Sequence, residues 1–188
     1  MGELPSSCKM RQYFMMTDAP PFPLSRHFDL ARLGDAAQEV TIDADAEARA
    51  AIARQFGIPA VEALSGRFHI SRIGPDQAEA RLELAAHVIQ SCVVSLEPVE
   101  QTIAERTSFR LLAGGEPDDA GSLDPDAPDD IVADGTVFDL GALLVEQLAL
   151  ALDPYPRRPG AEPPAASGTG AKDEAHPFAA LARLRRPD

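Results

Sequence analysis

The sequence predicts an α+β fold in which an antiparallel β-meander sheet or partial barrel packs with two to three helices. Apolar and polar residues alternate with a period of two from Ala80 to Leu96, which is typical of a half-buried strand. The connections to the neighbouring strands are short, as antiparallel pairing allows. An apolar stripe at helical spacing, from Leu140 to Leu152, predicts a helix that packs on this sheet.

Two short strands and a helix are predicted near the N-terminus. The strands cover residues 25–33 and 38–42, and apolar residues mark one face of each. Asp43 or Asp45 caps the following helix, because an aspartate side chain accepts hydrogen bonds from the free N–H groups of the first turn. Gly57 ends this helix, since glycine readily adopts the left-handed conformation that follows a helix.

A meander of strands is predicted over residues 66–112, after one further helical turn at residues 59–64. Gly74-Pro75-Asp76 supplies the residue types of a tight turn between two of its strands. In the long strand that follows, Gln90 is the polar exception among the inward-facing residues. Pro98 ends that strand, and the last strand of the meander returns antiparallel to it.

The second half of the chain predicts an acidic loop, a helix and flexible termini. Residues 114–134 hold eight acidic residues and no basic one, together with the glycine and proline of a loop. Asp139 caps the helix and Asp153-Pro154 ends it. The predicted organisation is a disordered N-terminal extension at 1–23, an α+β domain at 24–158, a Pro/Gly linker at 159–176 and a short basic amphipathic tail at 177–188.

The composition is that of an acidic protein. A formal net charge of −13 over 188 residues argues against a DNA-binding protein, which needs a basic face to release counterions from phosphates. No apolar run approaches the roughly 18 residues that span a bilayer, so no membrane contact is expected. The two cysteines, Cys8 and Cys92, lie far apart, which favours a reducing compartment and a cytoplasmic location.

The sequence carries none of the common catalytic motifs, and no cofactor is expected. Cys92 and His87 are near each other, but an even and an odd position face opposite sides of a strand, so they do not form a nucleophile and its base. Cys92 is expected to be a buried structural thiol, with a reactive thiol as the alternative. The four histidines are not clustered, so no metal site is predicted.

Polar residues near the ends of the long strand and of the second helix are the candidate contacts for a partner or RNA. They are Gln90, Glu97, Glu146, Gln147, Asp153, Tyr155, Arg157 and Arg158. Gln147 lies on the apolar stripe, where it is either a satisfied core amide or part of an exposed docking patch. Tyr155 beside two arginines can stack a base and hold phosphates, or it can belong to a solubilising helix exit.

The order and spacing of several segments resemble the YceD family, whose members are described as large ribosomal RNA subunit accumulation proteins. The resemblance runs from about residue 24 to residue 158, through Gln90 to Pro98, Asp139-Leu140 and Glu146 to Pro154, and returns at Pro177-Phe178. Typical members carry a Cys-x-x-Cys motif at the strand end and further cysteines after the helix. Here Ser95 stands at the second position and the later cysteines are absent, which resembles an alphaproteobacterial branch, so no metal or redox role is carried over.

The resemblance implies a non-enzymatic ribosome biogenesis factor that supports the accumulation of large-subunit ribosomal RNA. Its implied partners are an immature large subunit, its RNA or a basic ribosomal protein. The net charge of −13 favours a site that a protein helps to form over contact with RNA alone. The alternative is an acidic protein–protein adaptor for basic clients with no ribosomal role, and a third hypothesis is a small-molecule enzyme that uses Cys92.

Overall fold

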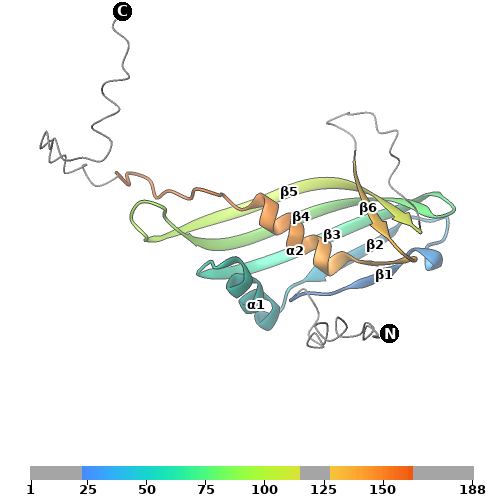
Figure 1. The fold of residues 1–188 in the computed structure, drawn as a ribbon, viewed down its shortest axis with the longest axis horizontal. Coiled ribbons are helices and arrows are strands. Elements are labelled where there is room, and N and C mark those ends of the chain that lie inside the picture. Colours follow the sequence, from blue (N-terminus) through green and yellow to red (C-terminus); the bar gives the residue numbers. More distant parts are fainter. Residues whose placement is uncertain (1–22, 115–127, 163–188) are drawn as a thin grey trace, which may run out of the picture.

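The computed structural model describes residues 23–114 and 128–162 of the chain. In chain order its elements (Figure 1) are β1 (His27–Asp29), the 3-10 helix η1 (Leu30–Arg32), β2 (Gln38–Asp43), α1 (Ala46–Phe56), β3 (Ala60–Gly74), β4 (Gln77–Ser91), β5 (Pro98–Ala113), β6 (Asp129–Ala133), β7 (Val137–Asp139) and α2 (Leu140–Ala151). The predicted tail, nearly all of the predicted N-terminal extension, most of the linker and the centre of the acidic loop lie outside the described residues.

Five strands form an open sheet in the order β2-β3-β4-β5-β6. Neighbouring strands are antiparallel, except that β6 runs parallel to β5. β1 and β7 form a separate antiparallel pair. The predicted α+β class is therefore confirmed, with an open sheet rather than a partial barrel and with two α-helices in the described part of the chain.

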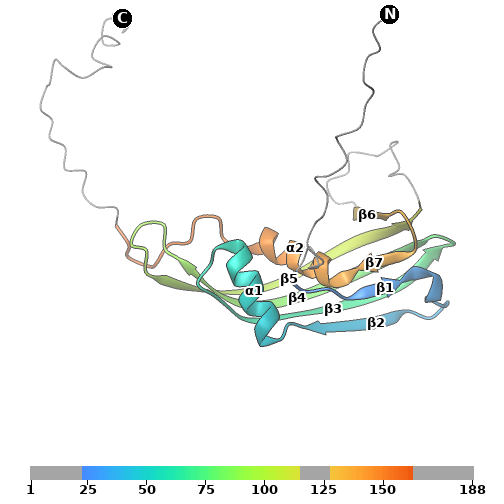
Figure 2. The same cartoon turned by 60° about the horizontal axis from the view of Figure 1, so that its bottom comes forward.

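Both helices and the β1–β7 pair lie on one face of the five-stranded sheet, and no other described element covers the opposite face (Figure 2). The core fills the space between these layers. Phe68 of β3, Leu82 of β4 and Phe109 of β5 are almost completely buried there, as are Leu144 and Leu148 of α2. Burial alternates residue by residue along β4, which confirms the predicted period of two as far as the strand extends.

The first turn of α2 is fixed by its N-cap, Asp139, as predicted. Asp139 Oδ1 accepts hydrogen bonds from the N–H groups of Gly141 and Ala142 at 2.9 and 3.1 Å. The same carboxylate accepts the N–H of Arg26 at 2.8 Å and the hydroxyl of Ser25 at 2.6 Å. The cap therefore ties the start of α2 to the chain that enters β1, and it helps to orient α2 across the sheet.

α1 begins and ends close to its predicted bounds. Asp45, one of the two proposed caps, accepts the N–H of Ala48 at 2.8 Å. Gly57 ends the helix with a positive φ of 65°, the conformation for which glycine is favoured. Ile52 is fully buried, so α1 covers part of the sheet with the apolar face that its spacing predicted.

Two segments near the N-terminus differ from the prediction. Residues 25–33 hold a three-residue strand followed by η1, because the Asp29 side chain accepts the N–H of Ala31 and starts a helical turn. Residues 59–64 do not form a helical turn; residue 60 opens β3, where Val61 and Leu64 are buried in the core. Pairing with β4 and burial decide this segment, and both depend on residues distant in sequence.

The long strand is shorter than its alternation predicted. β4 ends at Ser91, and the chain turns so that the N–H of Leu96 bonds to the carbonyl of Cys92 at 2.9 Å. Leu96 is 78% exposed instead of facing the core. Pro98 opens β5 rather than ending β4, which suits a residue that cannot donate to the ladder and stands at a strand start.

The predicted acidic loop at 114–134 contains a strand. β6 pairs with the end of β5, and Arg110 binds both carboxylate oxygens of Asp130 at 2.7 Å. The hydrogen bonds from this guanidinium lower the pKa of Asp130. Acidic composition indicated a solvated loop, but pairing of Asp130 with Arg110 on the neighbouring strand places part of the segment in the sheet.

Candidate functional site

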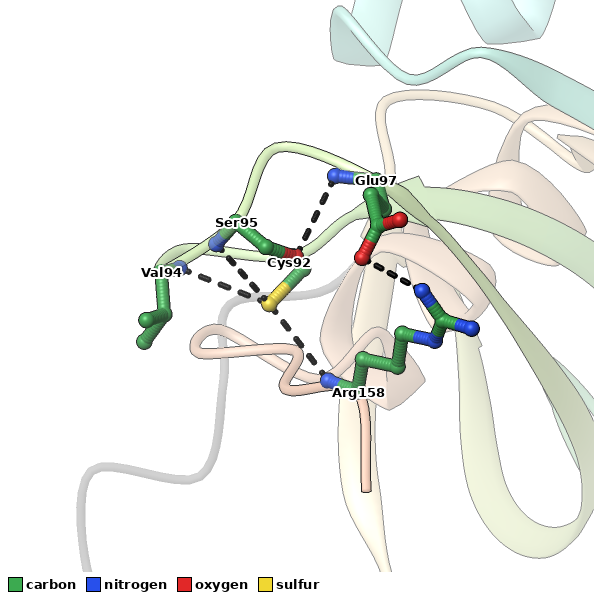
Figure 3. Close-up of polar contacts among 5 residues, drawn as sticks. All are labelled: Cys92, Val94, Ser95, Glu97 and Arg158. Carbon is green, nitrogen blue, oxygen red and sulfur yellow. Dashed lines mark hydrogen bonds and ion pairs between the residues drawn. The ribbon is translucent and has the colours of Figure 1, made fainter. Parts of the chain in front are cut away.

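The turn between β4 and β5 meets the segment that follows α2 at one end of the sheet (Figure 3). The N–H of Val93 donates to the carbonyl of Pro156 at 2.9 Å, and the N–H of Arg158 reaches the Sγ of Cys92 at 3.4 Å. We call residues 90–97 and 152–158 together the junction. Cys92 and Arg158 are 66 residues apart in sequence, so the fold alone brings them into contact.

The sulfur of Cys92 is the common acceptor of the junction. It is fully buried and accepts the backbone N–H groups of Val94, Ser95 and Arg158, each at 3.4 Å (Figure 3). Hydrogen bonds from the Ser95 side chain and from these N–H groups lower the pKa of Cys92 to about 6, although burial acts to raise it. At neutral pH the residue is therefore a thiolate that joins two segments of backbone, which favours the structural role. His87 contacts Glu62 instead, with 2.7 Å between Nδ1 and Oε2.

An ion pair between Glu97 and Arg158 spans the junction. Arg158 Nη1 donates to Glu97 Oε2, and the N–H of Glu97 donates to Ser95 Oγ at 3.5 Å. The hydrogen bond from Arg158 lowers the pKa of Glu97, and Glu97 in turn raises the pKa of Arg158. Both side chains are about half exposed, so the pair contributes little to stability and acts mainly to fix the geometry.

Two glutamines hold the C-terminal end of α2, where the last carbonyl groups lack partners within the helix. Gln101 donates to the carbonyl of Ala151 at 3.1 Å and accepts the N–H of Asp153 at 3.2 Å. Gln90 donates to the carbonyl of Asp153 at 2.9 Å. Gln90 is 6% exposed, and its Oε1 is buried without a hydrogen-bond partner among the described residues. These side chains hold the chain where it leaves α2 and direct it into the junction.

Most of the candidate contacts proposed from the sequence come together at the junction. Those that share its hydrogen bonds are Gln90, Glu97, Asp153 and Arg158, and they meet there the predicted structural thiol, Cys92. Tyr155 and Arg157 lie on the same segment with exposed side chains. Glu146 and Gln147 do not join them: both lie earlier in α2, where Glu146 is exposed and Gln147 is half-buried.

The sequence interpretation missed Gln101 and Ser95. Gln101 carries the same signal as Gln90, since it is a polar residue on the inward face of a strand, two positions before the buried Ile103. That signal could have predicted a polar anchor for the helix end. Ser95 lies in a turn, where no periodic pattern marks the side chains that point inward.

The junction also carries exposed hydrophobic side chains. Among the described residues, seven large hydrophobic side chains are exposed, and four of these lie in or just before the junction: Val93 (47%), Leu96 (78%), Leu150 (78%) and Tyr155 (72%). We call these four residues the junction hydrophobics. Leu96 has a φ of 62°, which is strained for a leucine and places its side chain in solvent. Exposed hydrophobic residues at a turn that hydrogen bonds hold in place are typical of a binding surface.

The uncovered face of the sheet holds a second candidate, a hollow of about 600 Å³. Its charged lining residues are His69, Arg81, Glu83 and Arg106. Arg81 pairs with Glu79 at 2.9 Å, and Arg106 pairs with Glu83 at 3.2 Å. Because each arginine already faces a carboxylate, the hollow offers little attraction for phosphate, and the junction is the better candidate.

Within residues 23–114 and 128–162, no group of three or more His, Cys, Asp or Glu side chains is arranged to hold a metal ion. Within the same residues, no helix is long and apolar enough to cross a membrane.

Comparison with known proteins gives one family match. The family model described as "Large ribosomal RNA subunit accumulation protein YceD" matches residues 80–185, more than half of the chain. The matched range begins in β4 and includes α2 and the junction, while β1 to β3 precede it. No curated protein and no solved structure matches the chain.

Proposed function

Because the chain belongs to the YceD family of large ribosomal RNA subunit accumulation proteins, we propose that it is a non-enzymatic ribosome biogenesis factor. It supports accumulation of large-subunit ribosomal RNA by binding an immature large subunit, its RNA or a basic ribosomal protein. The family match supports the role in ribosome biogenesis. The side chains exposed at the junction support the junction as the surface that contacts the partner.

The observation that carries the proposal is the set of side chains that the junction exposes. Leu96 and Tyr155 expose apolar surface, and the side chain of Arg157, two residues after Tyr155, is exposed as well. Aromatic residues and arginine are enriched in protein interfaces and in the residues that contribute most of the binding energy. Cys92 and Gln101 already fix the backbone beneath these side chains, so binding there costs less conformational entropy than it would on a mobile loop.

The net charge of the chain favours a contact on the large subunit that includes a basic protein over a contact with RNA alone. The net charge of −13 repels the phosphates of free RNA, whereas a basic ribosomal protein is attracted to the same charge. On the large subunit the two kinds of surface adjoin, so the exposed side chain of Arg157 can meet phosphates while the acidic remainder of the chain faces protein.

The test is gradient sedimentation of lysates from a strain that lacks the protein and from complemented strains. The deletion is expected to change the level of large-subunit precursors, and the full chain is expected to restore it. The double variant Leu96→Asp/Tyr155→Asp should fail to restore it, because two charges replace the exposed apolar side chains.

The matched control is Ile73→Asp/Val137→Asp, which introduces the same charge at exposed hydrophobic residues outside the junction, 53% and 50% exposed. This variant should restore the precursor level. Unchanged precursors on deletion would contradict the ribosomal function. Full restoration by the junction variant would contradict the contact site alone.

The acidic segment supports the second candidate, an adaptor for basic clients without a ribosomal role. Residues 114–134 hold eight acids, and this charge would bind basic proteins through screened Coulomb attraction. Pull-downs at rising salt separate the two proposals. An adaptor should release all its partners as ionic strength rises, whereas a junction complex with buried apolar contacts should retain ribosomal proteins.

A further inference from the structure

The junction hydrophobics expose apolar surface that nothing among the described residues covers. Leu96 and Leu150 are each 78% exposed, and Tyr155 is 72% exposed. The strained φ of Leu96 directs its own side chain into solvent. Backbone hydrogen bonds to Cys92 and Pro156 hold the turn in place. Burying such surface is worth roughly 25 cal/mol per Å², so an apolar segment within reach gains free energy by covering it.

The surroundings of these residues favour a basic occupant. α2 ends beside Leu150 with no basic residue in its last turn, so the partial negative charge of its C-terminal end is not compensated from within the helix. Asp153 adds an exposed carboxylate just after the end of α2, and Glu146 adds one in the middle of the helix. A partner that combines apolar residues with positive charge therefore matches the exposed apolar side chains and the end of α2, if its charges lie away from the exposed Arg157 and Arg158.

One segment of this chain has both properties. Phe178, Leu181 and Leu184 are spaced by three residues, a spacing that would put them on one face if the segment formed a helix, and Arg183, Arg185 and Arg186 add three positive charges. We propose that residues 177–188 bind in cis to the junction hydrophobics, with the apolar face of a helix against Leu96 and Tyr155 and with its arginines toward the end of α2. This contact would be the recognition of an amphipathic helix by an apolar surface, within one chain.

The length of chain between the two partners allows this contact. The N–H of Arg158 is bonded to Cys92, and only three residues separate Arg158 from Glu162, the last described residue. The fourteen residues 163–176 then extend at most roughly 50 Å, well beyond the size of the junction. A tether of this length gives an effective concentration in the range of about 1 mM, so even a weak contact is populated in cis.

The family match is consistent with a contact between the junction and the C-terminal segment, because the junction and most of that segment lie in the matched range. The matched residues, 80–185, include both the junction and the segment from Phe178 to Leu184, while β1 to β3 lie outside. The proposal does not rest on the ribosomal function, since it concerns contacts within one purified chain.

Tyrosine fluorescence of the full chain tests this contact. The sequence has no tryptophan and two tyrosines, so Tyr13→Phe leaves Tyr155 as the single reporter at the junction. In this background Leu181→Asp/Leu184→Asp is expected to raise the acrylamide quenching constant of Tyr155 by roughly twofold or more, because the reporter is no longer covered. Quenching should not depend on protein concentration, as a contact in cis requires.

The control Ala171→Asp/Ala179→Asp makes the same change in charge and keeps Phe178, Leu181 and Leu184. The acrylamide quenching constant of Tyr155 in this control should equal that in the Tyr13→Phe protein. Equal quenching of all three proteins would overturn the proposal. Protection of Tyr155 that grows with protein concentration would also overturn it, because a second copy would then be the occupant. These outcomes are independent of the sedimentation result for precursors.

Discussion

Cys92 shows how a single residue can join parts of the chain that local sequence does not relate. Its sulfur accepts three backbone N–H groups, two from its own turn and one from Arg158. Hydrogen bonds of this kind stabilise the thiolate over the thiol, which explains a pKa of about 6 in a fully buried side chain. Burial limits reaction with external reagents, so a low pKa here indicates a structural acceptor rather than a nucleophile.

Stability should rise with pH through ionisation of Cys92. Its pKa in the folded protein lies below the ordinary value of 9.0, so the stabilisation is complete above pH 9 and is lost as the pH falls through about 6. Urea unfolding of Cys8→Ser and Cys8→Ser/Cys92→Ser should therefore give free energies whose difference grows from pH 6 to pH 9. Parallel pH profiles for the two proteins would show that the thiolate does not stabilise the fold.

At the scale of elements, α2 is held at both ends by side chains from distant parts of the chain. Asp139 binds the first turn to Ser25 and Arg26, and Gln90 and Gln101 hold the last turn. The apolar stripe alone would leave the helix free to slide along the sheet. The polar contacts at its ends fix its position and therefore the position of the junction.

Replacing Asp139 with alanine should destabilise the protein by about 1–2 kcal/mol, the usual cost of losing an N-cap. Burial raises the pKa of Asp139, but hydrogen bonds from Ser25, Arg26 and the first turn of α2 outweigh it and lower the pKa. The stabilisation is therefore present above the ordinary pKa of 3.8 and is lost as the pH falls below it. Urea midpoints of the two proteins should converge at acid pH, and a constant difference would contradict this account.

Gly141 marks the place where the first turn of α2 crosses the chain before β1. A Cβ at this position would lie 2.7 Å from the nitrogen of Arg26 and 2.8 Å from the Cα of Ser25, both backbone atoms. Gly141→Ala should therefore cost about 1–3 kcal/mol in thermal or urea unfolding, because backbone must move. The control Gly34→Ala meets nothing within 4 Å and should leave stability unchanged within about 0.5 kcal/mol. Equal effects of the two changes would contradict the close approach.

At the scale of the whole molecule, the fold separates two surfaces with different properties. The uncovered sheet face carries arginines that are already paired with glutamates, as Arg106 is with Glu83. The junction, at one end of the sheet, carries three of the seven exposed large hydrophobic side chains of the described residues, and a fourth, Leu150, lies just before it. A partner that buries apolar surface should therefore select the end of the sheet over its open face.

Removing the paired arginines should leave both folding and docking largely intact. The double variant Arg81→Ala/Arg106→Ala removes side chains that are 69% and 84% exposed, and pairs of this kind contribute about 0–1 kcal/mol each. Its sedimentation with large-subunit precursors should match that of the unchanged protein. Loss of this association in a folded variant would place the contact on the open face instead.

Local patterns determined the α+β class, the period of two in β4, the bounds of α1 and both helix caps, because each depends on residues within a few positions of one another. The end of β4 at Ser91, the strand in the acidic segment and the shared role of Gln90 and Gln101 depended on tertiary structure. The alternation continues through Leu96, yet the turn is closed by contacts with Pro156 and Arg158. A hydrogen bond between residues 66 positions apart leaves no local periodic signal, so only the folded chain reveals the junction.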